Sequence, residues 1–108
     1  MNNSERVEQL LKFLQEEPND PFLLYALAVE YTDREPEEAM RYFEKLLREH
    51  ETYTATYYHA AALYSSLGTI EKAREIYLKG IEICEKQGKI HALTELRTAY
   101  TNFLYENE

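Results

Sequence analysis

The side chains best suited to chemistry are few, and their spacing does not form a reactive site. His50, His59 and His91 lie far apart, and none has a second histidine one helical turn away, as a helical pair of zinc ligands requires. The sequence has no nucleophile elbow, phosphate-binding loop or paired-carboxylate motif. Cys84 falls among apolar helical positions and is predicted to be a small buried side chain. We therefore predict no enzyme, no metal site and no cofactor.

Composition narrows the class of partner. The 20 acidic and 12 basic residues give a net charge of −8, and no basic patch stands out, so nucleic-acid binding is not expected. No apolar run approaches the roughly 18 residues that a membrane span needs, and the N-terminus does not resemble a secretory signal. A single cysteine is typical of a reducing compartment. We expect a cytoplasmic chain whose partner is a protein or peptide.

Helical periodicity covers most of the 108 residues and predicts about six helices. Proline, aspartate and glycine separate the segments: Asp20 can cap the helix that Pro21 begins, and Pro36 begins the next. Gly68 and Gly88 can end the fourth and fifth helices in a left-handed conformation. The predicted order is an N-terminal helix at 4–17, hairpins at 21–50 and 54–87, and a C-terminal helix at 89–105. The last residues of the chain, YENE, are expected to fray.

The two hairpins repeat one pattern. Small, aromatic and aliphatic residues of segment 39–47 recur in segment 73–81, 34 residues later. The preceding helices also match, at a spacing of 33 residues, with Leu24, Leu27, Ala28 and Tyr31 corresponding to Tyr57, Ala60, Ala61 and Tyr64. A helix pair that repeats about every 34 residues is typical of a stack of helical hairpins.

The segment 57–83, YYHAAALYSSLGTIEKAREIYLKGIEI, resembles a tetratricopeptide repeat. Its matching positions are Tyr57, Ala60, Ala61, Tyr64, Gly68, Ala73, Tyr77 and Gly80. The segment 24–47 fits less well, because its turn lacks glycine and Leu46 replaces a small residue. The resemblance implies an all-α fold, a right-handed superhelical stack of antiparallel hairpins, in one domain spanning residues 1–108.

Small residues mark the expected close contacts between helices. If the family geometry holds, Ala28 faces Ala39 and Ala61 faces Ala73, while Gly80 lies against the next helix. At the equivalent positions, the outer helices carry arginines, Arg6 and Arg97. Arginine cannot fill such a contact, so we expect the outer helices to cap the ends of a complete small protein.

The resemblance also implies a site, because in this family the first helices of successive hairpins line a concave groove. The residues expected there are Phe22, Tyr25, Val29, Tyr58, His59, Ala62, Ser65, Thr94 and Thr98. Some family members hold a peptide carboxylate with groove lysines, arginines and asparagines, but these positions are aromatic or small here. An apolar or aromatic peptide motif fits better, while the alternative is that the aromatic residues only pack between helices.

The fold and the predicted site are compatible with two functions. The first is an adaptor that binds a peptide or partner protein on the concave face. The alternative is a self-associating structural protein without a separate peptide ligand, a homo-oligomer formed through the terminal helices. In that case Leu11 and Phe13, or Phe103 and Leu104, would be buried between copies.

Overall fold

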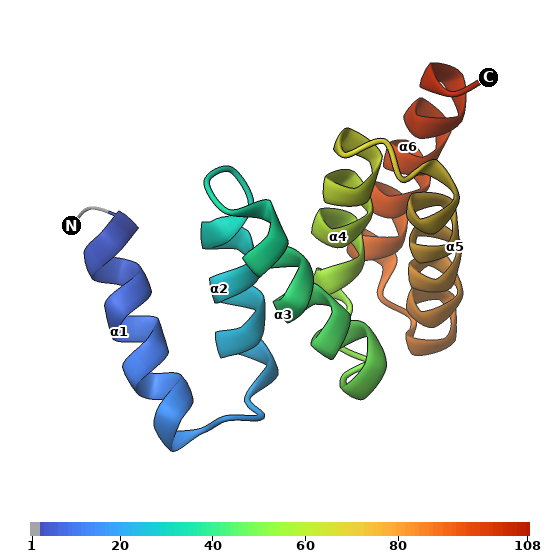
Figure 1. Cartoon of the computed structure of the whole chain (residues 1–108). Coiled ribbons are helices and arrows are strands. Elements are labelled where there is room, and N and C mark those ends of the chain that lie inside the picture. The colour runs from blue at the N-terminus through green and yellow to red at the C-terminus, as the bar shows by residue number, and fades with distance from the viewer. Residues whose placement is uncertain (1–2) are drawn as a thin grey trace. The chain divides into compact units, whose positions relative to one another are not determined.

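The computed structural model describes residues 3–108, in which all regular structure is helical (Figure 1). The helices are α1 (Asn3–Glu16), α2 (Pro21–Tyr31), α3 (Pro36–Glu49), α4 (Ala55–Ser66), α5 (Ile70–Gln87) and α6 (Ile90–Glu106). The prediction of an all-α chain with six helices is confirmed.

The helix ends are determined by local backbone chemistry. The Asp20 carboxylate accepts hydrogen bonds from the backbone N–H groups of Phe22, at 2.9 Å, and Leu23, at 3.4 Å, and Pro21 occupies the first turn of α2. Pro36 begins α3 in the same way. Gly68 and Gly88 follow α4 and α5 with φ of 83° and 66°, a conformation that disfavours side chains with a Cβ.

Removing the Asp20 cap should destabilise the chain measurably. We expect Asp20→Ala to lower the free energy of unfolding by about 1 kcal/mol, because two N–H groups at the start of α2 lose their acceptor. Asp20→Asn keeps a side-chain oxygen at the same place and should lose only a fraction of this. Urea denaturation followed by circular dichroism provides the comparison, and equal losses in the two variants would contradict the capping role.

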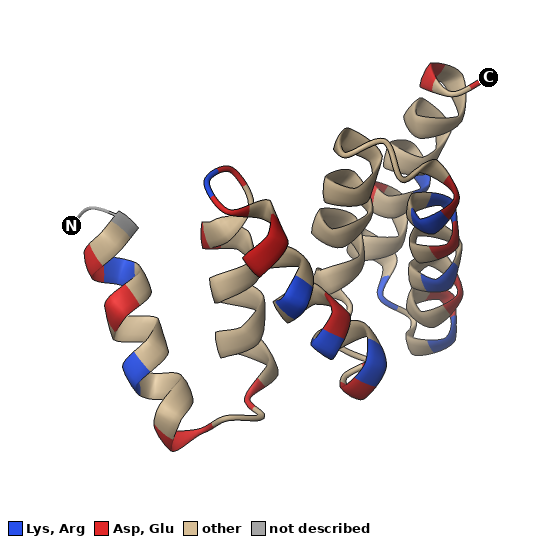
Figure 2. Ribbon diagram, in the orientation of Figure 1, with Lys and Arg blue, Asp and Glu red and all other residues tan. Residues whose placement is uncertain are grey.

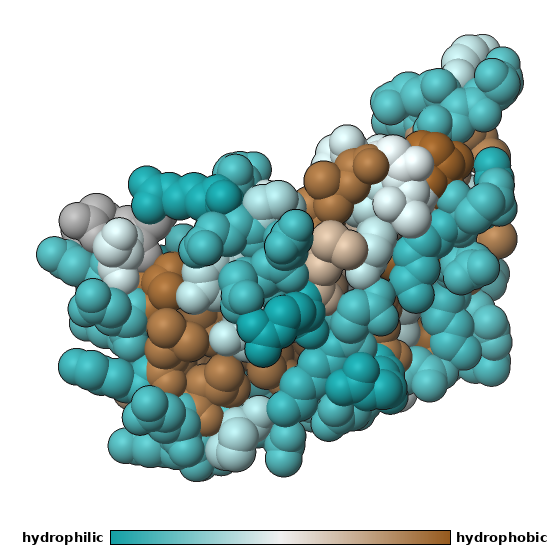
Figure 3. Space-filling view, in the orientation of Figure 1, coloured by the Kyte–Doolittle hydropathy of each residue, from teal (hydrophilic) through white to brown (hydrophobic). Residues whose placement is uncertain are grey.

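The first compact unit extends to Tyr53 and contains α1, α2 and α3. Helices α2 and α3 pack closely as a hairpin, and α1 contacts α2. The space-filling view shows apolar atoms between α1 and α2 (Figure 3). The cluster consists of buried Leu10, Leu23, Ala26 and Leu27, with Val7, Leu11, Leu14, Tyr31 and Tyr42 partly buried around it. At its edge, Arg6 Nε lies 2.6 Å from Glu30 Oε1, so this arginine is held by an ion pair.

The second compact unit spans residues 54–108 and contains α4, α5 and α6. Helices α4 and α5 form its hairpin, and α6 packs against both of them. The predicted stripe of α4 is buried, as are core residues of the other two helices. Together they include Tyr57, Ala60, Ala61, Tyr64, Ala73, Ile76, Gly80, Cys84, Leu96 and Phe103. Arg97 lies outside this core and pairs with Glu85 at 2.7 Å.

Gly80 allows the three helices of the second unit to approach one another. A Cβ atom at this position would lie 2.5 Å from Tyr57 Cβ on α4 and 3.1 Å from Leu96 Cδ1 on α6. Both distances are shorter than ordinary carbon–carbon contacts, so glycine is required by the packing.

Two further properties bear on function. Cys84 is a free, fully buried thiol, and burial raises its pKa because the thiolate is disfavoured away from water. Within residues 3–108, each helix is too short or too polar to cross a lipid bilayer.

Candidate functional site

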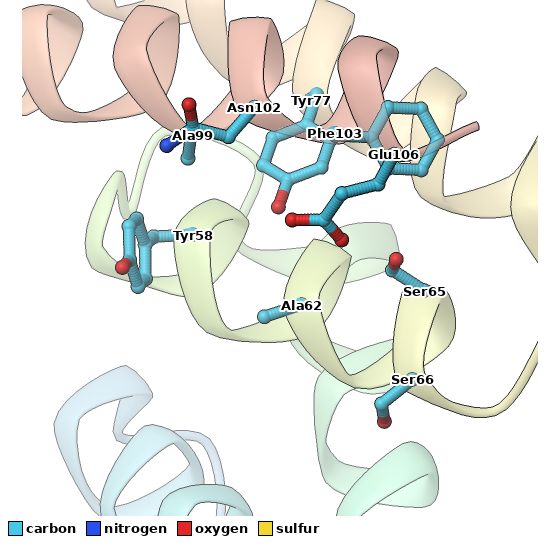
Figure 4. A pocket seen from close by; sticks show the side chains of 9 residues that line it. All are labelled: Tyr58, Ala62, Ser65, Ser66, Tyr77, Ala99, Asn102, Phe103 and Glu106. Atoms are coloured by element: carbon cyan, nitrogen blue, oxygen red, sulfur yellow. The ribbon is translucent and has the colours of Figure 1, made fainter. Parts of the chain in front are cut away.

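An open groove of about 390 Å³ lies in the second unit between α4 and α6, with one residue of α5 at its floor (Figure 4). Helix α4 places side chains along one wall, and α6 forms the opposite wall. The lining residues are Tyr58, Ala62, Ser65 and Ser66 of α4, Tyr77 of α5, and Ala99, Asn102, Phe103 and Glu106 of α6.

A second recess, of about 300 Å³, continues this surface. It is lined by Tyr58, Thr94, Glu95, Thr98, Ala99 and Asn102. Because Tyr58, Ala99 and Asn102 line both hollows, the two form one surface, which we name the α4–α6 groove. It follows both helices over several turns, a shape suited to an extended chain.

Tyr58 is the main aromatic side chain exposed in this groove. Its side chain is 42% exposed although α4 is otherwise well packed. The ring meets His59 edge-on, with the ring centroids 5.4 Å apart. His59 is half-buried, and burial lowers its pKa because the imidazolium form is disfavoured, while nearby Glu95 partly offsets this effect. The imidazole of His59 therefore packs against the ring of Tyr58.

Tyr77 and Glu106 meet at the floor of the groove. Tyr77 is only 5% exposed, and its ring packs against those of Tyr100 and Phe103 at centroid distances of 5.8 and 5.3 Å. Its hydroxyl points into the groove next to the Glu106 carboxylate (Figure 4). Burial raises the pKa of Tyr77, and the nearby Tyr58 and Glu106 raise it further.

The charged side chains that line the groove are all acidic. Its lining includes Glu95 and Glu106, whereas Lys and Arg are missing from the residues described along it. Helix α4 contains no Asp, Glu, Lys or Arg, and its ribbon is tan in the charge view (Figure 2). The groove offers hydroxyls, an amide, an aromatic ring and two carboxylates, so it is equipped to bind neutral or cationic groups.

The structure brings together most of the predicted site residues of the second unit. Tyr58, Ala62, Ser65, Thr94 and Thr98 all line the α4–α6 groove. His59 contacts Tyr58 and is not among the lining residues of the groove. These positions were expected from the family geometry, and they form a continuous surface.

The other three predicted residues lie on α2 in the first unit. Phe22 is 54% exposed, whereas Tyr25 and Val29 are half-buried. The Tyr25 ring packs on Tyr53 at 5.8 Å with an interplanar angle of 57°, and burial raises its pKa. Tyr25 therefore has a packing role within its own unit.

Several lining residues were missed by sequence reasoning. Glu95, Ala99, Asn102 and Glu106 follow one another at i, i+4, i+7 and i+11, a spacing that places them on one face of α6. This periodicity is a signal in the sequence. Glu106 was instead expected in a frayed end, but α6 continues through it, and Asn107 Nδ2 donates a hydrogen bond of 2.8 Å to the Phe103 carbonyl.

The groove does not have the ligand set of a metal centre. Within the described part of the chain, no three His, Cys, Asp or Glu side chains converge on one point.

Comparison with known proteins identifies relatives that share this helical architecture. The tetratricopeptide repeat family matches residues 54–87, which hold α4 and α5. The solution NMR structure of a tetratricopeptide repeat domain protein from Salinibacter ruber is 36% identical, with a TM-score of 0.74, covering 80% of this chain and 88% of that one. The crystal structure of a tetratricopeptide repeat domain protein from the same organism is 35% identical, with a TM-score of 0.73 and coverage of 78% and 96%.

A comparison with curated proteins gives no match. The likeness to the two solved structures nevertheless extends over most of each chain and is accompanied by substantial sequence identity. Together with the family match on the second hairpin, it shows that the chain belongs to the tetratricopeptide repeat family.

Proposed function

We propose that the chain is a binding module that holds an extended peptide segment of a partner protein in the α4–α6 groove. The family generally mediates protein–protein interactions and is generally a non-enzymatic scaffold. The observation that supports this site is the continuous open surface along α4 and α6 with the half-exposed Tyr58 at its centre. An aromatic ring with a hydroxyl offers a large contact area at low entropic cost.

The groove also offers partners for the polar backbone of an extended peptide. Asn102 supplies an amide that can donate and accept, and Ser65 supplies a hydroxyl. Ser66 is less available as a donor, because its hydroxyl already donates to the Leu63 carbonyl at 2.8 Å. Side chains that alternate along an extended peptide could then enter the two hollows in turn.

The test selects peptides from a phage-displayed random library on the full chain and measures the affinity of a selected peptide by fluorescence anisotropy. Ala62→Gln places a larger side chain in the groove and should weaken binding by about tenfold or more. Ala55→Gln is the matched control, since Ala55 is also an exposed alanine of α4 but does not line the groove. Failure to select any peptide, or equal affinity in both variants, would contradict the proposal.

Self-association through the terminal helices is the second candidate, favoured by exposed apolar side chains on α1 and α6. Phe13 on α1 is 55% exposed, and Leu104 on α6 is also exposed. Phe103 cannot contribute, because it is only 3% exposed and packs inside the second unit. Light scattering separates the candidates: a monomer at high protein concentration would exclude assembly.

A further inference from the structure

The Tyr77 hydroxyl is a polar group on a buried side chain that opens onto the groove. More than nine-tenths of this side chain is buried, yet its oxygen faces the groove beside the Glu106 carboxylate (Figure 4). Within the described residues the hydroxyl makes no hydrogen bond, and its interactions are the ring contacts and the electrostatic effects of Tyr58 and Glu106. Because this oxygen opens onto the groove and has no partner in the described chain, it is available to a donor that a ligand brings.

The two carboxylates of the groove also have no cationic neighbour in a salt bridge. Neither Glu95 nor Glu106 forms an ion pair with a Lys or Arg of the described chain. The two arginines of the second unit are engaged elsewhere: Arg97 pairs with Glu85, and Arg74 pairs with Glu71 and lies over the Phe103 ring. A negative field inside a groove favours positive ligands and disfavours acidic ones.

We propose that the α4–α6 groove receives a lysine or arginine side chain of the bound peptide, with its cationic end between the Glu106 carboxylate, the Tyr77 hydroxyl oxygen and the Tyr58 ring. This inference rests on the proposed function, because it names the chemistry of the peptide bound at that site. Ammonium and guanidinium groups are donors only, and the carboxylate and the hydroxyl oxygen are acceptors. The face of a tyrosine ring attracts a cation as well.

The groups at this place act together. Glu106 supplies charge, and Tyr77 supplies a second acceptor fixed by the packing of its ring against Tyr100 and Phe103. Tyr58 is exposed enough to close over the aliphatic stem of a long basic side chain. A ligand carboxylate here would instead meet Glu106, and like charges at short range are repulsive. The occupant is therefore a basic peptide segment.

The experiment uses the same random peptide library on the full wild-type chain, on Glu106→Gln and on Glu108→Gln. Each variant removes one carboxylate from a chain of net charge −8, but only Glu106 lines the groove. Peptides selected on wild type should carry Lys or Arg at one fixed position. Replacing that residue by norleucine or citrulline, which removes the charge, should weaken binding about three- to tenfold.

The variants then test which group receives the charge. Glu106→Gln should bind the basic peptide three- to tenfold more weakly than wild type does. Its affinity for the uncharged analogue should be no lower than that of wild type. Glu108→Gln should bind both peptides as wild type does. Tyr77→Phe, with circular dichroism to verify its fold, should also weaken the basic peptide more than the uncharged one. Raising the salt concentration should weaken binding in wild type more than in Glu106→Gln.

Two outcomes would overturn the inference, and they can be distinguished. In the first, selected peptides bind and Ala62→Gln blocks their binding, but the peptides show no enrichment of Lys or Arg, or are enriched in acidic residues. The proposed function then stands, and the inference of a basic ligand is wrong. If no peptide is selected at all, both proposals fail.

Discussion

Gly80→Ala should lower the free energy of unfolding by about 1–3 kcal/mol, although alanine is the better helix former. A Cβ at position 80 would lie 2.5 Å from Tyr57 Cβ and 2.7 Å from Tyr57 Cγ. These atoms are close to the backbone of α4 and cannot swing aside as the end of a flexible side chain could. The helices would have to separate, and the buried contacts of Tyr57 and Leu96 would weaken.

The sign of this change makes the test decisive. Helix propensity alone predicts that Gly80→Ala stabilises the chain by roughly 0.5–1 kcal/mol. Overpacking predicts a loss. Urea denaturation of both proteins gives the sign, with Glu75→Ala on the exposed surface of the same helix as a control that should change stability by less than about 0.5 kcal/mol. A more stable Gly80→Ala protein would contradict the packing of α4, α5 and α6.

Ala61→Leu should destabilise the chain by a similar amount, about 1–3 kcal/mol. Ala61 is 0% exposed in the hairpin of α4 and α5, where Ala73 on the facing helix is equally buried. Three extra carbon atoms cannot enter this contact without moving the helices apart. The adjacent Ala62 is exposed on the groove side, so Ala62→Leu adds the same atoms where there is space.

The two leucine variants form a matched pair in one helix. We expect Ala62→Leu to change the free energy of unfolding by less than about 0.5 kcal/mol, as is usual for surface substitutions. Denaturant titrations under identical conditions compare them. Comparable losses at both positions would show that the register assigned to α4 is wrong.

The helices could be predicted because their ends depend on neighbouring residues. Pro21 and Pro36 begin α2 and α3, and Gly68 and Gly88 follow α4 and α5 with positive φ. These effects act within one turn of the chain, and a sequence displays them directly. The buried stripe of α4 was predictable for a related reason: spacing along a helix determines the face on which each residue lies.

The candidate site was less predictable because it depends on where tertiary packing positions the functional groups of the side chains. Tyr77 belongs to the core face of α5 and packs against Tyr100 and Phe103 of α6, yet it also lines the groove. The contact of Tyr25 with Tyr53 could not be predicted either, because Tyr53 lies beyond the end of α3, where helical periodicity gives no guidance. Such contacts follow from tertiary packing and have no local signal.

The binding site itself can be located by amide chemical-shift mapping of the isotope-labelled full chain during titration with a library-selected peptide. We predict that the changes concentrate on α4 and α6, around Tyr58, Ala62, Ala99 and Asn102, while α1 and the exposed face of α5 stay unchanged. Changes confined to α1–α3, or to the exposed face of α5, would place the binding site elsewhere and contradict the assignment of the α4–α6 groove.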